Sequence, residues 1–110
     1  MPTPVFYLKV GDRLPSIEAT LLDFSGQAVN LTGATVEWVY RKLGAATGLV
    51  RSAAVVNAAQ GKVRYDWVAE DTIEPGLLDA EWRVTFADGR KMSFPNHRHL
   101  RLQIVSNLVD

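Results

Sequence analysis

Three stretches of the chain alternate large apolar side chains with polar ones at a period of two residues. Their apolar positions are Val36, Trp38 and Tyr40; Val63, Tyr65 and Trp67; and Ala80, Trp82, Val84 and Phe86. Successive side chains of an extended strand point to opposite faces, so each stretch builds one apolar and one polar face. All three tryptophans fall on apolar faces. We therefore expect them in a core between two β-sheets rather than on an exposed platform.

Further strands are predicted at residues 5–10, 17–21, 50–56, 92–94 and 99–105, with turn-forming sequences between them. The strand at residues 50–56 is weaker, because its side chains alternate less. The pair Asp88-Gly89 predicts a hairpin between residues 78–86 and 92–94. No stretch carries apolar residues at the i, i+3, i+4 and i+7 spacing of an amphipathic helix. The pattern predicts an all-β, antiparallel sandwich of about eight strands.

A chain of 110 residues is long enough to fold as a single domain, residues 1–110. The first residues, Met1-Pro2-Thr3-Pro4, lack the basic and apolar regions of a secretion signal. Two prolines there resist packing, so we predict a flexible arm over residues 1–5. No apolar run approaches the length of a membrane span. We expect a soluble protein that is made in a cytosol.

The charged residues limit the kinds of function that the chain is expected to have. Twelve basic and twelve acidic residues cancel, which argues against nucleic-acid binding. Six acids and no base lie within residues 66–81, and five bases with one acid lie within residues 83–101. These blocks either make a polar molecule suited to heterologous contacts or neutralise one another within the monomer. The chain has no cysteine, which excludes disulfides and thiolate metal sites.

Candidate chemistry is sparse. His97 and His99 have the i, i+2 spacing of a metal-binding pair, but zinc needs a third protein ligand and no residue of fixed spacing supplies it. Glu70, Asp71 and Glu74 cluster in one short connection, whereas glycoside hydrolysis needs carboxylates that face each other across a cleft. We instead expect Asp71 and Thr72 to cap a turn and Pro75-Gly76 to redirect the chain. The residues therefore predict no catalytic, cofactor or metal site, and a protein that is not an enzyme.

Turn and strand-start motifs recur from about residue 8 to residue 108. They are Gly11-Asp12 before Pro15, Asp23-Phe24-Ser25-Gly26, Asn30-Leu31-Thr32-Gly33, Gly61-Lys62-Val63-Arg64-Tyr65, Asp71-Thr72 with Pro75-Gly76, Ala80-Glu81-Trp82, and Phe94-Pro95-Asn96. As a set they resemble an Ig-like domain of tailed-phage virions and are similar to the N-terminal domain of phage baseplate upper proteins. The resemblance implies an Ig-like sandwich of about 7–8 strands. It also implies a chain that crosses between sheets at Asp71-Thr72.

Relatives of this kind often carry an aromatic residue, usually tyrosine, just after the Pro-Gly pair. This chain has Leu77-Leu78 there. The resemblance therefore implies that a tyrosine-corner hydrogen bond is lost or replaced.

The resemblance implies a non-enzymatic structural component of a tailed-phage or prophage virion, made in the host bacterial cytoplasm. The tail, the baseplate and the capsid surface are its candidate locations. Its partners would be other virion proteins and further copies of itself, with no cofactor, nucleic acid or membrane. Candidate contact residues near the two chain ends are Val5, Tyr7, Arg98, His99 and Arg101. The alternative is a carbohydrate-binding or adhesion module, which needs exposed aromatic side chains in loops at one end of the sandwich.

Overall fold

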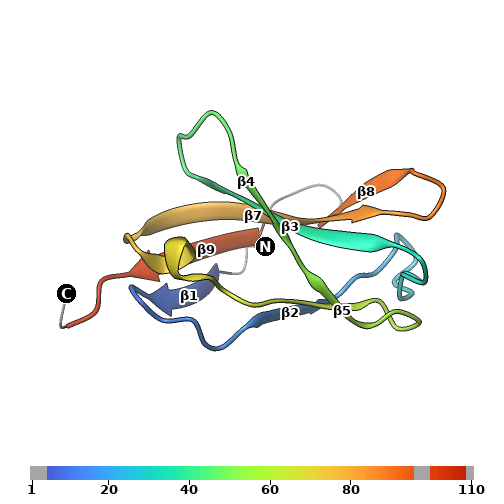
Figure 1. Ribbon diagram of the computed structural model, residues 1–110, viewed down its shortest axis with the longest axis horizontal. Coiled ribbons are helices and arrows are strands. Elements are labelled where there is room, and N and C mark those ends of the chain that lie inside the picture. Colours follow the sequence, from blue (N-terminus) through green and yellow to red (C-terminus); the bar gives the residue numbers. More distant parts are fainter. Residues whose placement is uncertain (1–4, 96–99, 109–110) are drawn as a thin grey trace.

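The computed structural model describes residues 5–95 and 100–108. They form nine strands and one short 3-10 helix, arranged as two facing sheets (Figure 1). The elements are β1 (Val5–Lys9), β2 (Ile17–Thr20), β3 (Thr35–Lys42), β4 (Leu49–Ser52), β5 (Ala54–Asn57), β6 (Lys62–Tyr65), η1 (Ala69–Thr72), β7 (Gly76–Thr85), β8 (Lys91–Phe94) and β9 (Leu100–Val105). The all-β sandwich predicted from the alternation is confirmed. No helix in the described ranges has the length and apolar character needed to cross a bilayer.

The strand order resembles that of a variable-type immunoglobulin sandwich, although no described strand takes the place of its C″ strand. One sheet has the order β1-β9-β7-β3-β4, with β8 also paired to β7, and the other has the order β2-β6-β5. Taken along the chain, β2, β6 and β5 occupy the places of strands B, E and D. The strands β9, β7, β3 and β4 occupy those of G, F, C and C′.

One pairing corrects the expectation of an antiparallel sandwich. β1 runs parallel to β9, with Val5 opposite Arg101 and Lys9 opposite Val105, whereas the other named pairs are antiparallel. The cause is that β1 lies beside the last strand instead of beside β2, its neighbour in the chain (Figure 1). Strand direction depends on this long-range pairing and leaves no trace in the local alternation.

The single strand expected at residues 50–56 is also wrong. The segment forms two strands in different sheets, since β4 pairs with β3 and β5 pairs with β6. Between them the Ala53 N–H donates a hydrogen bond to the Val36 carbonyl at 3.0 Å. Strands that change sheets make the corners of sandwiches. The side chains therefore face different layers before and after Ala53, which explains the weak alternation.

The predicted aromatic core is confirmed. Trp38, Trp67 and Trp82 are all buried, and Trp38 is fully enclosed. The Trp38 ring stacks on Tyr65 with centroids 5.4 Å apart, and it meets Trp82 and Trp67 edge-on at 4.7 and 5.8 Å. Such aromatic pairs contribute about 0.5–1.5 kcal/mol each beyond area burial. Because β3 and β7 belong to one sheet and Tyr65 to the other, this cluster joins the two layers.

The predicted Asp-Gly hairpin is confirmed as the β7–β8 connection. The Gly89 N–H donates to the Phe86 carbonyl at 2.9 Å, and Gly89 has φ +89°, which disfavours other residues. β8 pairs with residues 82–85 of β7, and β9 pairs with residues 76–80. β8 and β9 thus pair with successive parts of β7, on the side opposite β3.

Candidate functional site

The structure brings together three of the five predicted contact residues. Val5 and Tyr7 lie on β1, at the edge of the larger sheet, and Val5 is the register partner of Arg101 on β9. Leu8 is buried and side chains alternate, so Val5 and Tyr7 share the outer face of this sheet. Tyr7 is 62% exposed. Val5 belongs to β1, so of the predicted arm only residues 1–4 precede the strand; they lie outside the described residues, as do Arg98 and His99.

The guanidinium of Arg101 is engaged inside the molecule. Its Nε and Nη2 atoms lie 3.2 and 3.1 Å from Asp79 Oδ1 on β7. Asp79 comes from the acidic block and Arg101 from the basic block, so the two blocks meet across neighbouring strands. This contact favours neutralisation within the monomer over a molecule with two charged ends.

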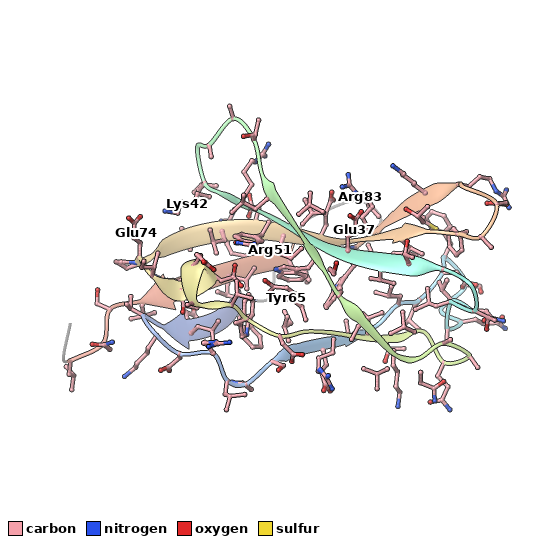
Figure 2. The ribbon with its side chains drawn as sticks, viewed as in Figure 1. Glu37, Lys42, Arg51, Tyr65, Glu74 and Arg83 are labelled. Carbon is pink, nitrogen blue, oxygen red and sulfur yellow. The ribbon has the colours of Figure 1, made fainter. Side chains whose placement is uncertain are left out.

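Other charges of the two blocks also find partners close by. Arg83 Nε lies 3.4 Å from Glu37 Oε1, and Lys42 Nζ lies 2.7 Å from Glu74 Oε2 at one end of the sandwich (Figure 2). Ion pairs near the surface add little to stability, because solvent screens them and ordering two long side chains costs entropy. In both pairs a charge of one block is balanced by a residue outside the two blocks.

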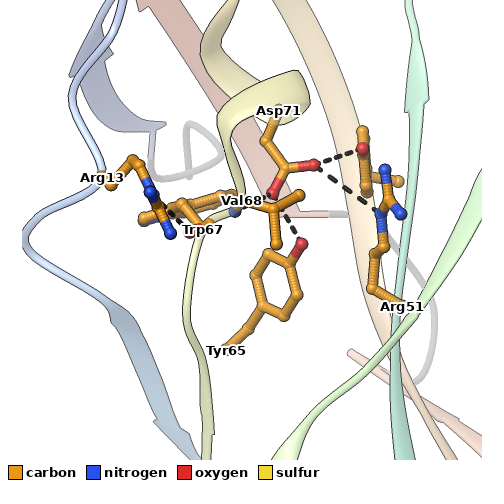
Figure 3. A network of polar contacts seen from close by, with 7 residues as sticks. Arg13, Arg51, Tyr65, Trp67, Val68 and Asp71 are labelled. Atoms are coloured by element: carbon orange, nitrogen blue, oxygen red, sulfur yellow. Dashed lines mark hydrogen bonds and ion pairs between the residues drawn. The ribbon is translucent and has the colours of Figure 1, made fainter.

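A buried carboxylate lies at the same end of the sandwich (Figure 3). The hydroxyls of Tyr40 and Tyr65 both donate hydrogen bonds to Asp71, the second at 2.6 Å. The Val68 N–H donates to Asp71 Oδ2 at 2.9 Å, and Arg51 Nε lies 4.0 Å from Oδ1. The role of Asp71 as a turn cap is therefore confirmed, with a larger network than the sequence predicts. The same role for the Thr72 side chain is wrong, because its buried Oγ1 has no hydrogen-bond partner among the described residues.

The network shifts the ionisation of both tyrosines. Burial, with the Asp71 hydrogen bond second, raises the pKa of Tyr40 to about 12. The same two causes raise the pKa of Tyr65. Oδ1 of Asp71 accepts one hydrogen bond and Oδ2 accepts two, so most of the acceptor capacity of this carboxylate serves the interior of the fold.

Local sequence explains how the network forms. Asp71 sits in η1, three residues after Val68, and its side chain turns back to bond the Val68 amide as helix-capping residues do. Tyr40 and Tyr65 occupy the apolar faces of β3 and β6, where a hydroxyl must find an acceptor. Both hydroxyls therefore bond to the β6–β7 corner through Asp71.

The three acidic residues of the β6–β7 connection have separate roles. Asp71 is buried in the tyrosine network, Glu74 pairs with Lys42, and Glu70 is exposed. Within residues 5–95 and 100–108, no three His, Cys, Asp or Glu side chains gather closely enough to hold a metal ion.

An open cavity of about 670 Å³ lies beside this network. It is lined by the β3–β4 hairpin, η1 and the start of β7. Leu43, Leu49 and Ile73 line it, although 56%, 53% and 69% of their surface is exposed. The sequence shows only a loop of small residues at the hairpin, so the cavity could not be predicted from the alternation. A concave, mainly apolar surface of this size is typical of a contact site.

No protein-family model and no curated protein matches this chain. The likeness of its turn motifs to Ig-like virion domains therefore stays a prediction.

Proposed function

We propose that the protein is a non-enzymatic structural component of a tailed-phage or prophage virion and acts through protein–protein contacts. One observation carries the proposal. The groups that chemistry would need, above all Asp71 with Tyr40 and Tyr65, are bonded to one another inside the fold. Strand edges and apolar side chains remain exposed, and these are the means of assembly rather than of catalysis.

The turn motifs support the proposal because they have structural roles. Gly61 has φ +67°, and a Cβ there would meet the carbonyl oxygens of Leu21 and Val29 at 2.8 Å. Asp23 Oδ1 accepts hydrogen bonds from the Ser25 and Gln27 amides in the predicted turn. The residues that carry the resemblance to virion domains therefore specify a scaffold.

The proposed partners are other virion structural proteins and further copies of this chain, in the tail, the baseplate or the capsid. The protein would be made in the host bacterial cytoplasm and would need no cofactor. Tyr7, exposed at the β1 edge, is our preferred contact residue there, because tyrosine contributes strongly at interfaces.

The alternative of a carbohydrate-binding module has less support. Sugar stacking needs exposed aromatic rings, and all three tryptophans are buried. The exposed rings that remain in the described part of the chain are Phe24, in the turn at residues 23–26, and Tyr7, on β1.

Mass spectrometry of purified particles tests the proposal. We expect the protein at a fixed copy number relative to the major structural proteins. Deleting residues 1–4 should lower its incorporation while leaving the thermal midpoint unchanged, because these residues precede the first strand. Absence of the full-length protein from particles would overturn the assignment to a virion. Normal incorporation of the truncated protein would show only that residues 1–4 take no part in assembly.

A further inference from the structure

A stretch of fourteen residues with one charge runs along an edge of the molecule. Residues 44–57 have the sequence GAATGLVRSAAVVN, with Arg51 as the only charged residue, in a chain of which 22% of residues are charged. The stretch includes β4 and β5. It exposes Leu49, Val50 and Val56, at 53%, 47% and 52% of their surface.

β4 is a four-residue edge strand that, apart from its shortness, lacks the usual protection against pairing. Native sheets guard their edges with charged side chains, prolines or bulges. Here β1 carries Lys9, β2 carries Glu18, and β5 has a register shift between Val55 and Asn57. Within β4 the only charge is Arg51, whose Nε lies near the buried Asp71 rather than guarding the edge (Figure 3).

The backbone of β4 has free hydrogen-bonding groups on its outer side. The Ala53 N–H bonds to β3, and peptide groups alternate in direction along a strand, so those of Val50 and Ser52 point away from β3. β4 ends the strand order of the larger sheet, so no described strand lies beyond it. An added strand would satisfy these groups.

The stretch is complementary to itself when it is reversed. In an antiparallel pair centred on Val50, Val50 faces Val50 of a second copy, and Gly48 faces Ser52. Arg51 then faces Leu49, so no like charges are opposed. Beyond them Thr47 faces Ala53, and these small side chains let the backbones approach.

We propose that two copies of this chain pair β4 against β4 about a two-fold axis at Val50, which joins two six-stranded sheets into one. The pairing completes the backbone hydrogen bonds of both edges and covers Leu49 and Val50. This inference rests on the proposed assembly role and names a second copy as one partner. A strand pair this short buries a small area, so we expect a reversible dimer at protein concentrations of about 100 µM.

Sedimentation of the purified full chain tests the pairing. Val50→Lys places like charges opposite each other at the two-fold axis and should weaken dimerisation at least about tenfold. The matched control is Val56→Lys on β5, an equally exposed valine outside the proposed register, which should leave dimerisation unchanged. An equimolar mixture of the Val50→Lys and Val50→Glu variants should regain a dimer of one copy of each.

Three outcomes would overturn the pairing: a wild-type monomer at all concentrations, a dimer that Val50→Lys does not weaken, or a charge-swapped mixture that stays monomeric. Circular dichroism and the thermal midpoint confirm that each variant is folded. A monomer in solution that is present in particles would overturn the β4 pairing alone. A dimer that is absent from particles would overturn the virion assignment alone.

Discussion

Two neighbouring regions of the sandwich distribute polarity in opposite ways. At the η1 corner, Asp71 and the hydroxyls of Tyr40 and Tyr65 are buried and bonded to one another. At the β4 edge, Val50 is exposed and backbone groups point outward with no strand of the described residues to receive them. Arg51 belongs to both regions, since its side chain reaches toward Asp71 and its backbone forms part of the edge.

This contrast separates the groups that stabilise the folded monomer from the groups that remain exposed for contacts with other proteins. A buried polar group destabilises a protein unless it is bonded, so every member of the corner network matters for stability. An exposed apolar side chain on an edge strand contributes little to the stability of the folded monomer. Substitutions in the two regions should therefore change different measurements.

The largest effect is expected from removing the shared acceptor. Asp71→Ala leaves two buried hydroxyls and the Val68 N–H without an acceptor. We expect the free energy of unfolding to fall by about 3–5 kcal/mol, measured by urea titration with tryptophan fluorescence. The neighbouring Glu70→Ala, on an exposed side chain, should change it by less than about 0.5 kcal/mol. A similar loss of stability in both variants would show that the buried position of Asp71 is not what makes it important.

Alkaline pH should have the second-largest effect on the free energy of unfolding, through the two tyrosines of the η1 corner. Tyrosine in an unfolded chain ionises near pH 10, whereas burial and the Asp71 hydrogen bond raise the pKa of Tyr40 to about 12. Between these values the unfolded chain binds fewer protons, so the stabilisation present below pH 10 is lost as pH rises. The expected slope is about 1.4 kcal/mol per pH unit for each such tyrosine. Urea titrations at several pH values should show a shallower fall for Tyr40→Phe, and an equal fall would contradict the assignment.

Removing one hydroxyl at a time should have a smaller effect at neutral pH. Tyr40→Phe and Tyr65→Phe each keep the ring but take one donor from Asp71. We expect each to lower the free energy of unfolding by about 1–2 kcal/mol. Tyr7→Phe is the matched control on an exposed ring and should be neutral, so an equal loss there would point to a general effect of the substitution.

The smallest effect on stability is expected at the edge. Val50→Lys should change the free energy of unfolding by less than about 0.5 kcal/mol, because Val50 is exposed in the monomer. The measurement is made at a protein concentration well below that of dimerisation. A loss above 1 kcal/mol would show that the β4 edge also supports the monomer.

The parts of this fold that could be predicted from the sequence are those encoded locally. Strict alternation placed Trp38, Trp67 and Trp82 in the core, and Asp88-Gly89 predicted the hairpin, because both signals act over a few residues. Alternation says which face a side chain takes but not which sheet holds its strand. The division between β4 and β5 and the parallel placement of β1 could not be predicted for this reason.

The sites show the same limit. Tyr40 and Asp71 are separated by 31 residues, and no spacing rule links them. The one signal in the sequence is the position of Tyr40 on an apolar face, because a buried tyrosine hydroxyl requires an acceptor. At the other edge, the candidate contact residues Val5 and Arg101 are brought together by the parallel pairing that the sequence pattern missed.

On the side away from β3, β7 carries two partners one after the other. β9 pairs with residues 76–80 of β7 and β8 pairs with residues 82–85, so the two ladders share no residue of β7. The tip of the β7–β8 hairpin at Asp88-Gly89 should therefore fray without loosening β9, and through β9 the edge strand β1 stays attached to the sheet.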